Sequence, residues 1–184
     1  GEVKFTRKWD GAPSIFFGVN SDGDAWIARK GLFNKDAKKY YKRSDFDDDP
    51  KFPEELKEPL WNTLVYLGRS WAGPESDGYF VQGDLMFTDD VETETIDGQR
   101  MYTFQPNTIV YAAPVNSDLG RTFARAKIGI VFHTTYKGDE LQDMKAAFGA
   151  DISKLKKTSS VWMDDATYKD CLLYTSPSPR DNLP

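Results

Sequence analysis

The feature that most constrains the fold of this chain is a series of short segments in which apolar and polar residues alternate. A period of two is typical of half-buried β-strands, because successive side chains of a strand point to opposite faces of a sheet. The pattern predicts strands over residues 2–7, 14–19, 25–30, Tyr79–Phe87, Thr108–Ala113 and Lys127–Thr135, and a hairpin arm over Asp97–Thr103. Residues 20–24 have the composition of a hairpin turn between two of these strands.

Helical spacing is confined to two segments. After Pro53, four leucines recur at intervals of three or four residues, which predicts a helix that Pro59 kinks or splits. These leucines are Leu56, Leu60, Leu64 and Leu67. A second, short helix is predicted over Glu140–Phe148, ended by Gly149. Many strands with few, late helices indicate an α+β domain with antiparallel sheets, and not a repeated βαβ unit.

Composition is consistent with one globular domain over residues 1–170. Of the whole chain, 39% is hydrophobic and 14% aromatic, and no apolar run approaches the roughly 18 residues that cross a membrane. The only cysteine is Cys171, which excludes a disulfide framework and a Cys-ligated metal site from this domain. His133 is the only histidine, so a histidine-rich metal site is disfavoured as well. The net charge of −5 does not favour nucleic-acid binding by overall charge, although local patches can still bind phosphate.

The sequence at both ends of the chain predicts that the chain is a fragment. The alternation at Val3 and Phe5 begins without a start methionine or a capping residue before it. At the other end, the run Cys171–Asp181 resembles the translation of a commonly used sequencing-library adapter. On this interpretation residues 171–184 are a non-native tail without regular structure; the alternative is a native disordered terminus.

The residues whose chemistry most clearly suggests a function are Lys8 and its neighbours Asp10 and Gly11, which follow the first predicted strand. A lysine attacks a phosphorus atom only as the neutral amine, so its pKa of roughly 10.4 must be lowered by burial or by nearby cations. Asp10 can oppose that shift or orient the amine, and Gly11 permits a tight turn that lets phosphate approach the backbone. The alternative is a solvated lysine at a strand end beside an Asp-Gly turn.

These residues resemble the Lys-x-Asp-Gly motif of the covalent nucleotidyltransferases, which include ATP-dependent DNA ligases, RNA ligases and mRNA capping enzymes. Three later strings resemble further motifs of that superfamily in the same order: Ala28–Gly31, Phe80–Leu85 and Ile128–His133. The resemblance implies a ligase-like fold, ATP or GTP with Mg²⁺ as cofactors, and RNA or DNA ends as acceptors. It further implies that Lys8 forms a lysyl–NMP intermediate.

The same resemblance assigns roles to other residues. Arg29 would contact the ribose, with Lys30 beside it in the motif, and Asp84 would contact the sugar or a metal ion. Tyr111 would stack on the base. Lys127 and His133, at the two ends of the last motif-bearing strand, complete the candidate nucleotide-binding set: Asp10, Gly11, Arg29, Lys30, Asp84, Tyr111, Lys127 and His133.

The sequence also departs from the superfamily pattern. Ile128 stands where the superfamily has a metal-binding glutamate, His133 replaces a lysine, and Asp84 replaces a glutamate. Pro13 stands where DNA ligases have an arginine, which favours RNA ligase-like or divergent members. The superfamily's closing Lys-x-Lys motif corresponds to Lys154–Lys156 or is missing with the C-terminus. Loss of an acidic metal ligand weakens magnesium binding and thereby catalysis, because magnesium neutralises the charge of the triphosphate.

A second resemblance is to an uncharacterised protein family of large tailed bacteriophages. It rests on the runs Gly83–Phe87, Thr103–Tyr111 and Gly129–Tyr136. It implies a protein that acts in the cytoplasm of the infected host, and it supplies no mechanism. The alternative function is therefore a non-catalytic phage binding or assembly protein that retains this fold.

Three of these features also have purely structural interpretations. Asp84 can form a salt bridge, because an acid in an apolar strand needs a partner or a ligand. His133 can be a satisfied histidine at the rim of the core. The basic run 35–43 can guide a nucleic-acid backbone, or it can be a solvated loop whose following acids, at 45–49, repel phosphate.

Overall fold

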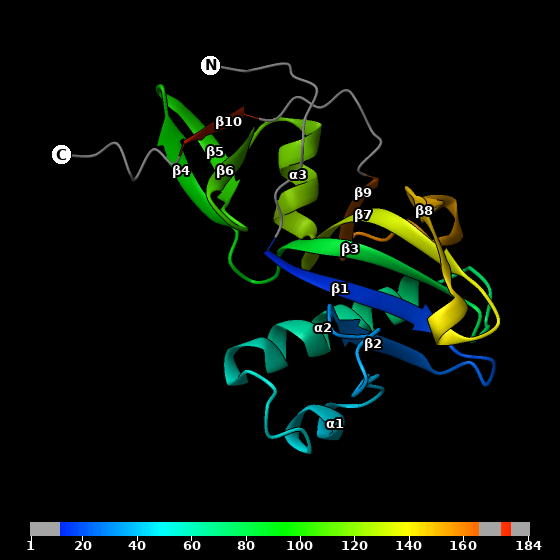
Figure 1. The fold of residues 1–184 in the computed structure, drawn as a ribbon. Helices are drawn as coiled ribbons and strands as arrows, with labels where there is room; N and C mark the ends of the chain where they lie inside the picture. The colour runs from blue at the N-terminus through cyan, green and yellow to red at the C-terminus, as the bar shows by residue number, and fades with distance from the viewer. Residues whose placement is uncertain (1–11, 166–173, 178–184) are drawn as a thin grey trace.

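The computed structural model describes residues 12–165 and 174–177, and it contains two β-sheets with helices packed against them (Figure 1). The larger sheet consists of β1 (Ala12–Val19), β2 (Ala25–Arg29), β3 (Tyr79–Phe87), β7 (Ile128–Lys137), β8 (Lys145–Phe148) and β9 (Val161–Asp165). Its strand order is β2-β1-β3-β7-β8, and β9 also pairs with β7. Because β8 pairs with residues 134–137 and β9 with residues 128–132, these two short strands share one edge of β7.

The smaller sheet consists of β4 (Glu92–Ile96), β5 (Gln99–Phe104), β6 (Ile109–Pro114) and β10 (Tyr174–Pro177), in the order β10-β6-β5-β4. The β4–β5 hairpin turns at Asp97 and Gly98, whose φ angles of 51° and 77° are both positive. An Asp-Gly pair suits such a turn, because aspartate tolerates and glycine favours the left-handed region. The only parallel pair within the described strands is β7–β9, so the α+β class with antiparallel sheets is confirmed.

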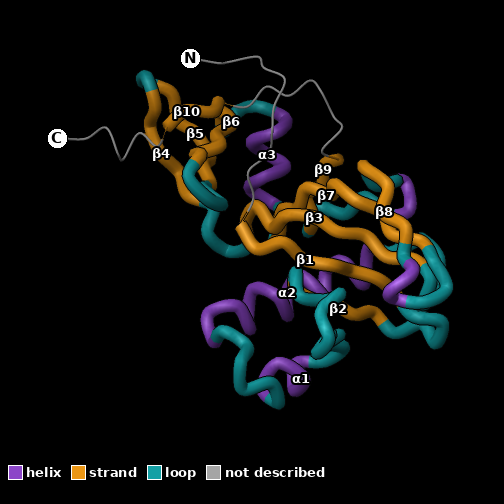
Figure 2. The backbone as a smooth tube through the Cα atoms, in the orientation of Figure 1, coloured by secondary structure: helices purple, strands orange, loops and turns teal. Residues whose placement is uncertain are grey.

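Three α-helices occur in the described residues: α1 (Arg43–Asp47), α2 (Glu54–Ser70) and α3 (Asp118–Arg125). Two 3₁₀ turns, Leu141–Asp143 and Ile152–Lys154, lie in the connections around β8. The helix α2 covers one face of the larger sheet, whereas α3 lies between the two sheets (Figures 1 and 2). Within the described residues, no helix is long and apolar enough to cross a membrane.

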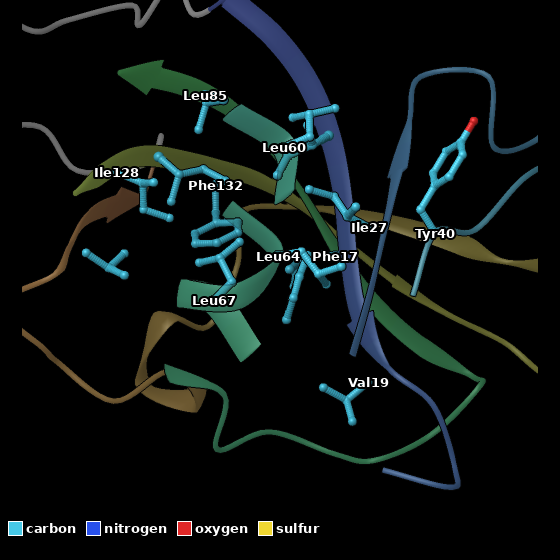
Figure 3. Close-up of a cluster of buried hydrophobic side chains, with 14 of the residues drawn as sticks. Phe17, Val19, Ile27, Tyr40, Leu60, Leu64, Leu67, Leu85, Ile128 and Phe132 are labelled. Atoms are coloured by element: carbon cyan, nitrogen blue, oxygen red, sulfur yellow. The ribbon is translucent and has the colours of Figure 1, made fainter. Parts of the chain in front are cut away.

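The main hydrophobic core lies between α2 and the larger sheet. The leucines predicted to form the helical stripe point toward β1 and β7, where Leu64 and Leu67 approach Phe17 and Phe132 (Figure 3). Burial of each such side chain contributes roughly 1.5–3 kcal/mol, so this layer is the principal source of stability. Pro59 lies within α2, which nevertheless continues to Ser70.

Two smaller apolar clusters lie on the opposite face of the larger sheet. One joins the C-terminal end of β3 to α3 and the smaller sheet, and its residues are Met86, Phe87, Phe104, Tyr111, Ala113, Phe123, Val131 and Trp162. The other lies around β2 and the N-terminal end of β3, and its residues are Phe16, Trp26, Ala28, Leu32 and Phe80. The centre of this face, between the two clusters, is not apolar.

The predicted strands agree with β1, β2, β3, β5, β6 and β7 to within a few residues, and the helix after Pro53 is confirmed. The helix predicted over Glu140–Phe148 is wrong. Only Leu141–Asp143 turn, and β8 then pairs with β7 through partners such as Ala147 and Thr135. The ladder hydrogen bonds offered by the edge of β7 outweigh the local helical pattern. The predicted strand 2–7 lies outside the described residues.

Four further described elements were not expected from the pattern: α1, α3, β4 and β9. The segment 171–184, expected to lack regular structure, contributes β10, which pairs with β6. Whether that segment is native protein stays a prediction.

Candidate functional site

A row of polar side chains crosses the centre of the larger sheet on the face away from α2. Ser14 of β1 lies directly opposite Asp84 of β3, and Gln82 lies two residues before Asp84 on the same face. His133 of β7 completes this set, which we call the polar row. All four side chains are partly buried, so they are held by neighbours yet accessible to a ligand.

Asp84 and His133 are the two members of the polar row that lie close enough to form an ion pair. The Oδ1 atom of Asp84 lies 3.4 Å from Nε2 of His133, and each side chain is 26% exposed. A register shift in the β3–β7 ladder places His133 between the pairs Gln82–Thr134 and Gly83–Phe132. The bulge re-aims the imidazole toward Asp84. The second ring nitrogen, Nδ1, lies 2.7 Å from Oγ1 of Thr134.

A chain of hydrogen bonds fixes the remaining part of the polar row. The hydroxyl of Tyr136 donates to Oε1 of Gln82 at 2.8 Å, and Nε2 of Gln82 donates to the hydroxyl of Ser14 at 2.9 Å. Burial raises the pKa of Tyr136, so its hydroxyl stays protonated and remains a donor. This network links three strands and orients the Ser14 hydroxyl beside Asp84.

Aromatic side chains flank the polar row at one end. Tyr136 stacks on Phe80, with ring centroids 5.0 Å apart. Phe33 packs against Tyr136 at 5.2 Å but remains 43% exposed. An exposed ring beside half-exposed polar groups is able to stack on a planar ligand while carboxylate and amide groups bind its hydroxyls.

Three of the predicted site residues, Lys8, Asp10 and Gly11, lie outside the described residues. The structure does define where the chain enters the sheet after them. Ala12, the first residue of β1, pairs with Leu85, the residue after Asp84. The chain therefore enters β1 at the position of the polar row.

Arg29 lies on the other face of the sheet from Asp84. It pairs directly with Ile15, whose side chain belongs to the core beneath α2, and directly paired residues share a face. Its guanidinium lies 5.6 Å from the ring centroid of Phe52. Lys30 follows in the exposed turn after β2. The structure therefore separates Arg29 from Asp84, although the sequence expected both around one nucleotide.

Tyr111 and Lys127 also lie apart from the polar row. Tyr111 is 1% exposed and stacks on Phe104 inside the cluster that joins the two sheets, so its ring is not available to a base in this structure. Lys127 is exposed at the start of β7. Six residues of strand separate it from His133, a distance of roughly 20 Å.

The position of Ile128 bears on the motif assigned to β7. Its side chain is fully buried in the core beneath α2, together with Ile130 and Phe132. His133 points to the opposite face. An acid at position 128 would therefore not lie beside Asp84. The isoleucine found here instead of the superfamily's glutamate thus does not deprive the polar row of a metal ligand.

Comparison with known proteins identifies the family of this chain. A family described only as a family of unknown function, DUF6267, matches residues 1–179. The chain belongs to the DUF6267 family. No curated protein and no solved structure matches it.

The donors that this DUF6267 member offers to a metal ion are few. Within the described residues there is no group of three or more His, Cys, Asp or Glu side chains able to hold one. Asp84 and His133 supply two donors. That set suits Mg²⁺ only when most ligands come from water and substrate phosphates, which is the usual arrangement for this ion.

Sequence reasoning missed Ser14 and Tyr136 as members of this region of the DUF6267 chain. Neither stands out locally, because each is one polar position in an alternating strand. Gln82 lies within the string Phe80–Leu85 that resembles a superfamily motif, but it was given no role. Only the register between β1, β3 and β7 shows that these side chains meet.

Proposed function

We propose that this chain is a ligase-like nucleotidyltransferase domain in which Lys8 accepts a nucleoside monophosphate from ATP or GTP. The Nζ atom of neutral Lys8 would attack the α-phosphorus, forming a P–N bond as the P–O bond to pyrophosphate breaks. The amine proton leaves to solvent or a nearby base. An RNA or DNA end would be the later acceptor of the nucleotide.

The observation that supports this proposal best is the polar row at the point where the chain enters β1. Lys8 precedes Ala12 by four residues, and four residues of extended chain span at most about 14 Å. Because Ala12 pairs with the neighbour of Asp84, the covalent connection keeps Lys8 within reach of the polar row. The order of motif-like strings along the sequence supports the same proposal.

The proposed roles follow the geometry of the described residues. Asp84 and His133 would bind ribose hydroxyls, and the Asp84 carboxylate would help to hold a Mg²⁺ ion. Ser14 and Gln82 would orient these groups. A bound Mg²⁺ ion offsets the charge of the triphosphate and of the leaving pyrophosphate. Phe33, the exposed ring beside the polar row, replaces Tyr111 as the candidate for stacking on the base.

The second candidate is a non-catalytic binding or assembly protein that keeps this fold. The donor set of the polar row favours it, because Asp84 is the single carboxylate among Ser14, Gln82, Asp84 and His133, and the row offers no second acid to hold a metal. Under this alternative the Asp84–His133 pair is a structural contact. The two candidates differ in whether Lys8 becomes covalently modified.

The deciding experiment uses the protein, labelled ATP or GTP, and Mg²⁺. We expect a labelled protein adduct that is labile in acid, as a phosphoramidate is, and that disappears in Lys8→Ala. Lys4→Ala is the matched control, since it removes another lysine of the same segment and should retain the adduct. Asp84→Asn should reduce adduct formation by about 10²-fold or more if the carboxylate stabilises the transition state.

Two results would count against the enzymatic proposal. One is the absence of any adduct with either nucleotide. The other is an adduct that survives Lys8→Ala, which would assign the chemistry to a different residue. The first result leaves the non-catalytic binding protein as the better interpretation, and the second removes Lys8 from the proposed mechanism.

A further inference from the structure

The connection after β2 forms a second candidate site, at the β2 edge of the larger sheet. It encloses a pocket of roughly 910 Å³ between the loop that follows Arg29 and the segment around Pro50. Five cationic side chains line this pocket, whereas only two carboxylates do. We call it the basic pocket, and its cations are Arg29, Lys30, Lys35, Lys38 and Lys51.

The loop that carries the basic pocket is anchored at both ends. Ile27 and Tyr40 exchange backbone hydrogen bonds of 3.0 and 2.9 Å, which close the loop between them. Inside it, backbone turns join Leu32 to Arg29, Asn34 to Gly31 and Ala37 to Asn34. The lysines therefore project from a hydrogen-bonded frame, and a ligand would meet a partly preorganised arrangement of charge.

The carboxylate of Asp49, at the base of the pocket, already forms hydrogen bonds and an ion pair with other groups of the protein. Asp49 is 9% exposed and accepts hydrogen bonds from the Tyr40 hydroxyl at 2.6 Å and the Lys51 backbone N–H at 3.0 Å. Its ion pair with Lys38 measures 3.0 Å. The hydrogen bond from Tyr40 is the main reason why the pKa of Asp49 is lowered to about 2. Asp49 is thus a structural anion that positions Lys38.

Asp45 and Asp47, two other acids of residues 45–49, do not line the pocket and contact other protein groups. The carboxylate of Asp45 accepts hydrogen bonds from the backbone N–H groups of Tyr41 and Lys42. Asp47 pairs with Lys57 at 3.0 Å. These contacts engage two of the acids that the sequence predicted to repel phosphate from the neighbouring basic run. Among the described residues, no ion pair engages Lys30, Lys35 or Lys51, whose side chains are exposed.

We propose that the basic pocket binds a ligand carrying two or more phosphate groups, held by Lys30, Lys35 and Lys51 around the Lys38–Asp49 pair. Two sources share this chemistry: the backbone of a single-stranded nucleic acid and a free polyphosphate. The proposal concerns binding alone and does not depend on nucleotidyl transfer by Lys8. It adds a second anion site, lined by residues other than those of the polar row.

The test compares two double variants that each remove two positive charges. Lys35→Gln/Lys51→Gln changes the basic pocket, and Lys145→Gln/Lys157→Gln changes exposed lysines outside it. The probes are fluorescent single strands of DNA and RNA of about 12 nucleotides, within the range that one binding domain covers, and sodium tripolyphosphate. Binding is measured by anisotropy and by calorimetry from about 50 mM salt upward, because phosphate binding is strongly salt-dependent. Thermal unfolding of each variant checks that the fold is retained.

We expect the pocket variant to bind about tenfold more weakly than the parent. For a single strand, the slope of log affinity against log salt should also become shallower by about 0.7 for each phosphate that is no longer neutralised. The control variant should bind like the parent. Weaker binding of the oligonucleotides alone identifies a nucleic-acid strand as the ligand source, and weaker binding of tripolyphosphate as well identifies the phosphate cluster itself. Equal weakening in the two variants, or no binding of any probe by the parent, would overturn the proposal.

Discussion

The two faces of the larger sheet are made from alternating residues of the same strands, yet they differ in kind. The face beneath α2 is continuous and apolar, with Phe17, Leu85 and Phe132 packed against the leucines of the helix. The opposite face carries two separate apolar clusters with Asp84 and His133 between them. A sheet needs only one closed face to be stable, so the other is available for polar groups that bind a ligand.

This difference separates residues that serve stability from candidates for function. Ile128 and Asp84 both occupy positions that the superfamily resemblance assigns to a metal site. Ile128 belongs to the closed face and Asp84 to the open one. The face on which a residue lies therefore separates the stabilising residue, Ile128, from the candidate functional residue, Asp84, more clearly than its place in a motif does. The same comparison yields three predictions about stability.

The largest effect is expected at the closed face. Phe132→Ala should lower the free energy of unfolding by about 3–5 kcal/mol, because it leaves a cavity between β7 and α2. Urea unfolding measures the change, and Phe132→Leu provides a milder variant that should remain folded. Phe148→Ala is the matched control, since this phenylalanine is 77% exposed on β8 and its replacement should change the free energy by no more than about 0.5 kcal/mol. Equal destabilisation at the two positions would contradict the assignment of the core.

The sequence was sufficient to predict the closed face but not the open one. The leucine spacing after Pro53 and the alternation over Tyr79–Phe87 both depend on local periodicity, which one segment displays by itself. The polar row depends instead on cross-strand register. A bulge at His133 and the pairing of Ser14 with Asp84 bring together residues far apart in the sequence.

Local pattern also misled in two places for the same physical reason. Residues 145–148 have a helical pattern but find hydrogen-bond partners on the edge of β7. Tyr111 lies in an expected strand, but α3 was not predicted, and the cluster that contains Phe123 of α3 buries its ring. In both cases a distant segment determines the outcome, and a single sequence does not show which segment that is.

An intermediate effect is expected at Tyr40, where the closed face meets the basic pocket. Tyr40→Phe keeps the ring in the core but removes the hydroxyl that donates to buried Asp49. A hydrogen bond to a charged group contributes about 1.5–3 kcal/mol, so the free energy of unfolding at pH 7 should fall by about that amount. Chemical denaturation measures the decrease. A change below about 0.5 kcal/mol would mean that Lys38 and the Lys51 backbone satisfy the carboxylate without Tyr40.

The pH dependence of this variant follows from the sign of the shift at Asp49. Its folded pKa of about 2 lies below the unfolded value near 3.9, so its contribution is present above pH 4 and is lost as the pH falls toward 2. The stability difference between the parent and Tyr40→Phe should therefore shrink between about pH 5 and pH 2. In an Asp49→Asn background, the effect of Tyr40→Phe should not change over this range. A difference that persists unchanged at pH 2 in the parent background would assign the effect to packing.

The smallest effect is expected in the polar row. Asp84 and His133 are each 26% exposed and lie 3.4 Å apart, and solvent reaches and screens such a pair, so a double-mutant cycle with Asp84→Asn and His133→Gln should give a coupling below about 1 kcal/mol. A coupling above about 2 kcal/mol would make the pair a structural salt bridge and would remove the contrast between the two faces. A small value has a practical consequence. Asp84→Asn would then remain folded, and its effect in the nucleotide-adduct assay would report on chemistry at the polar row and not on the stability of the sheet.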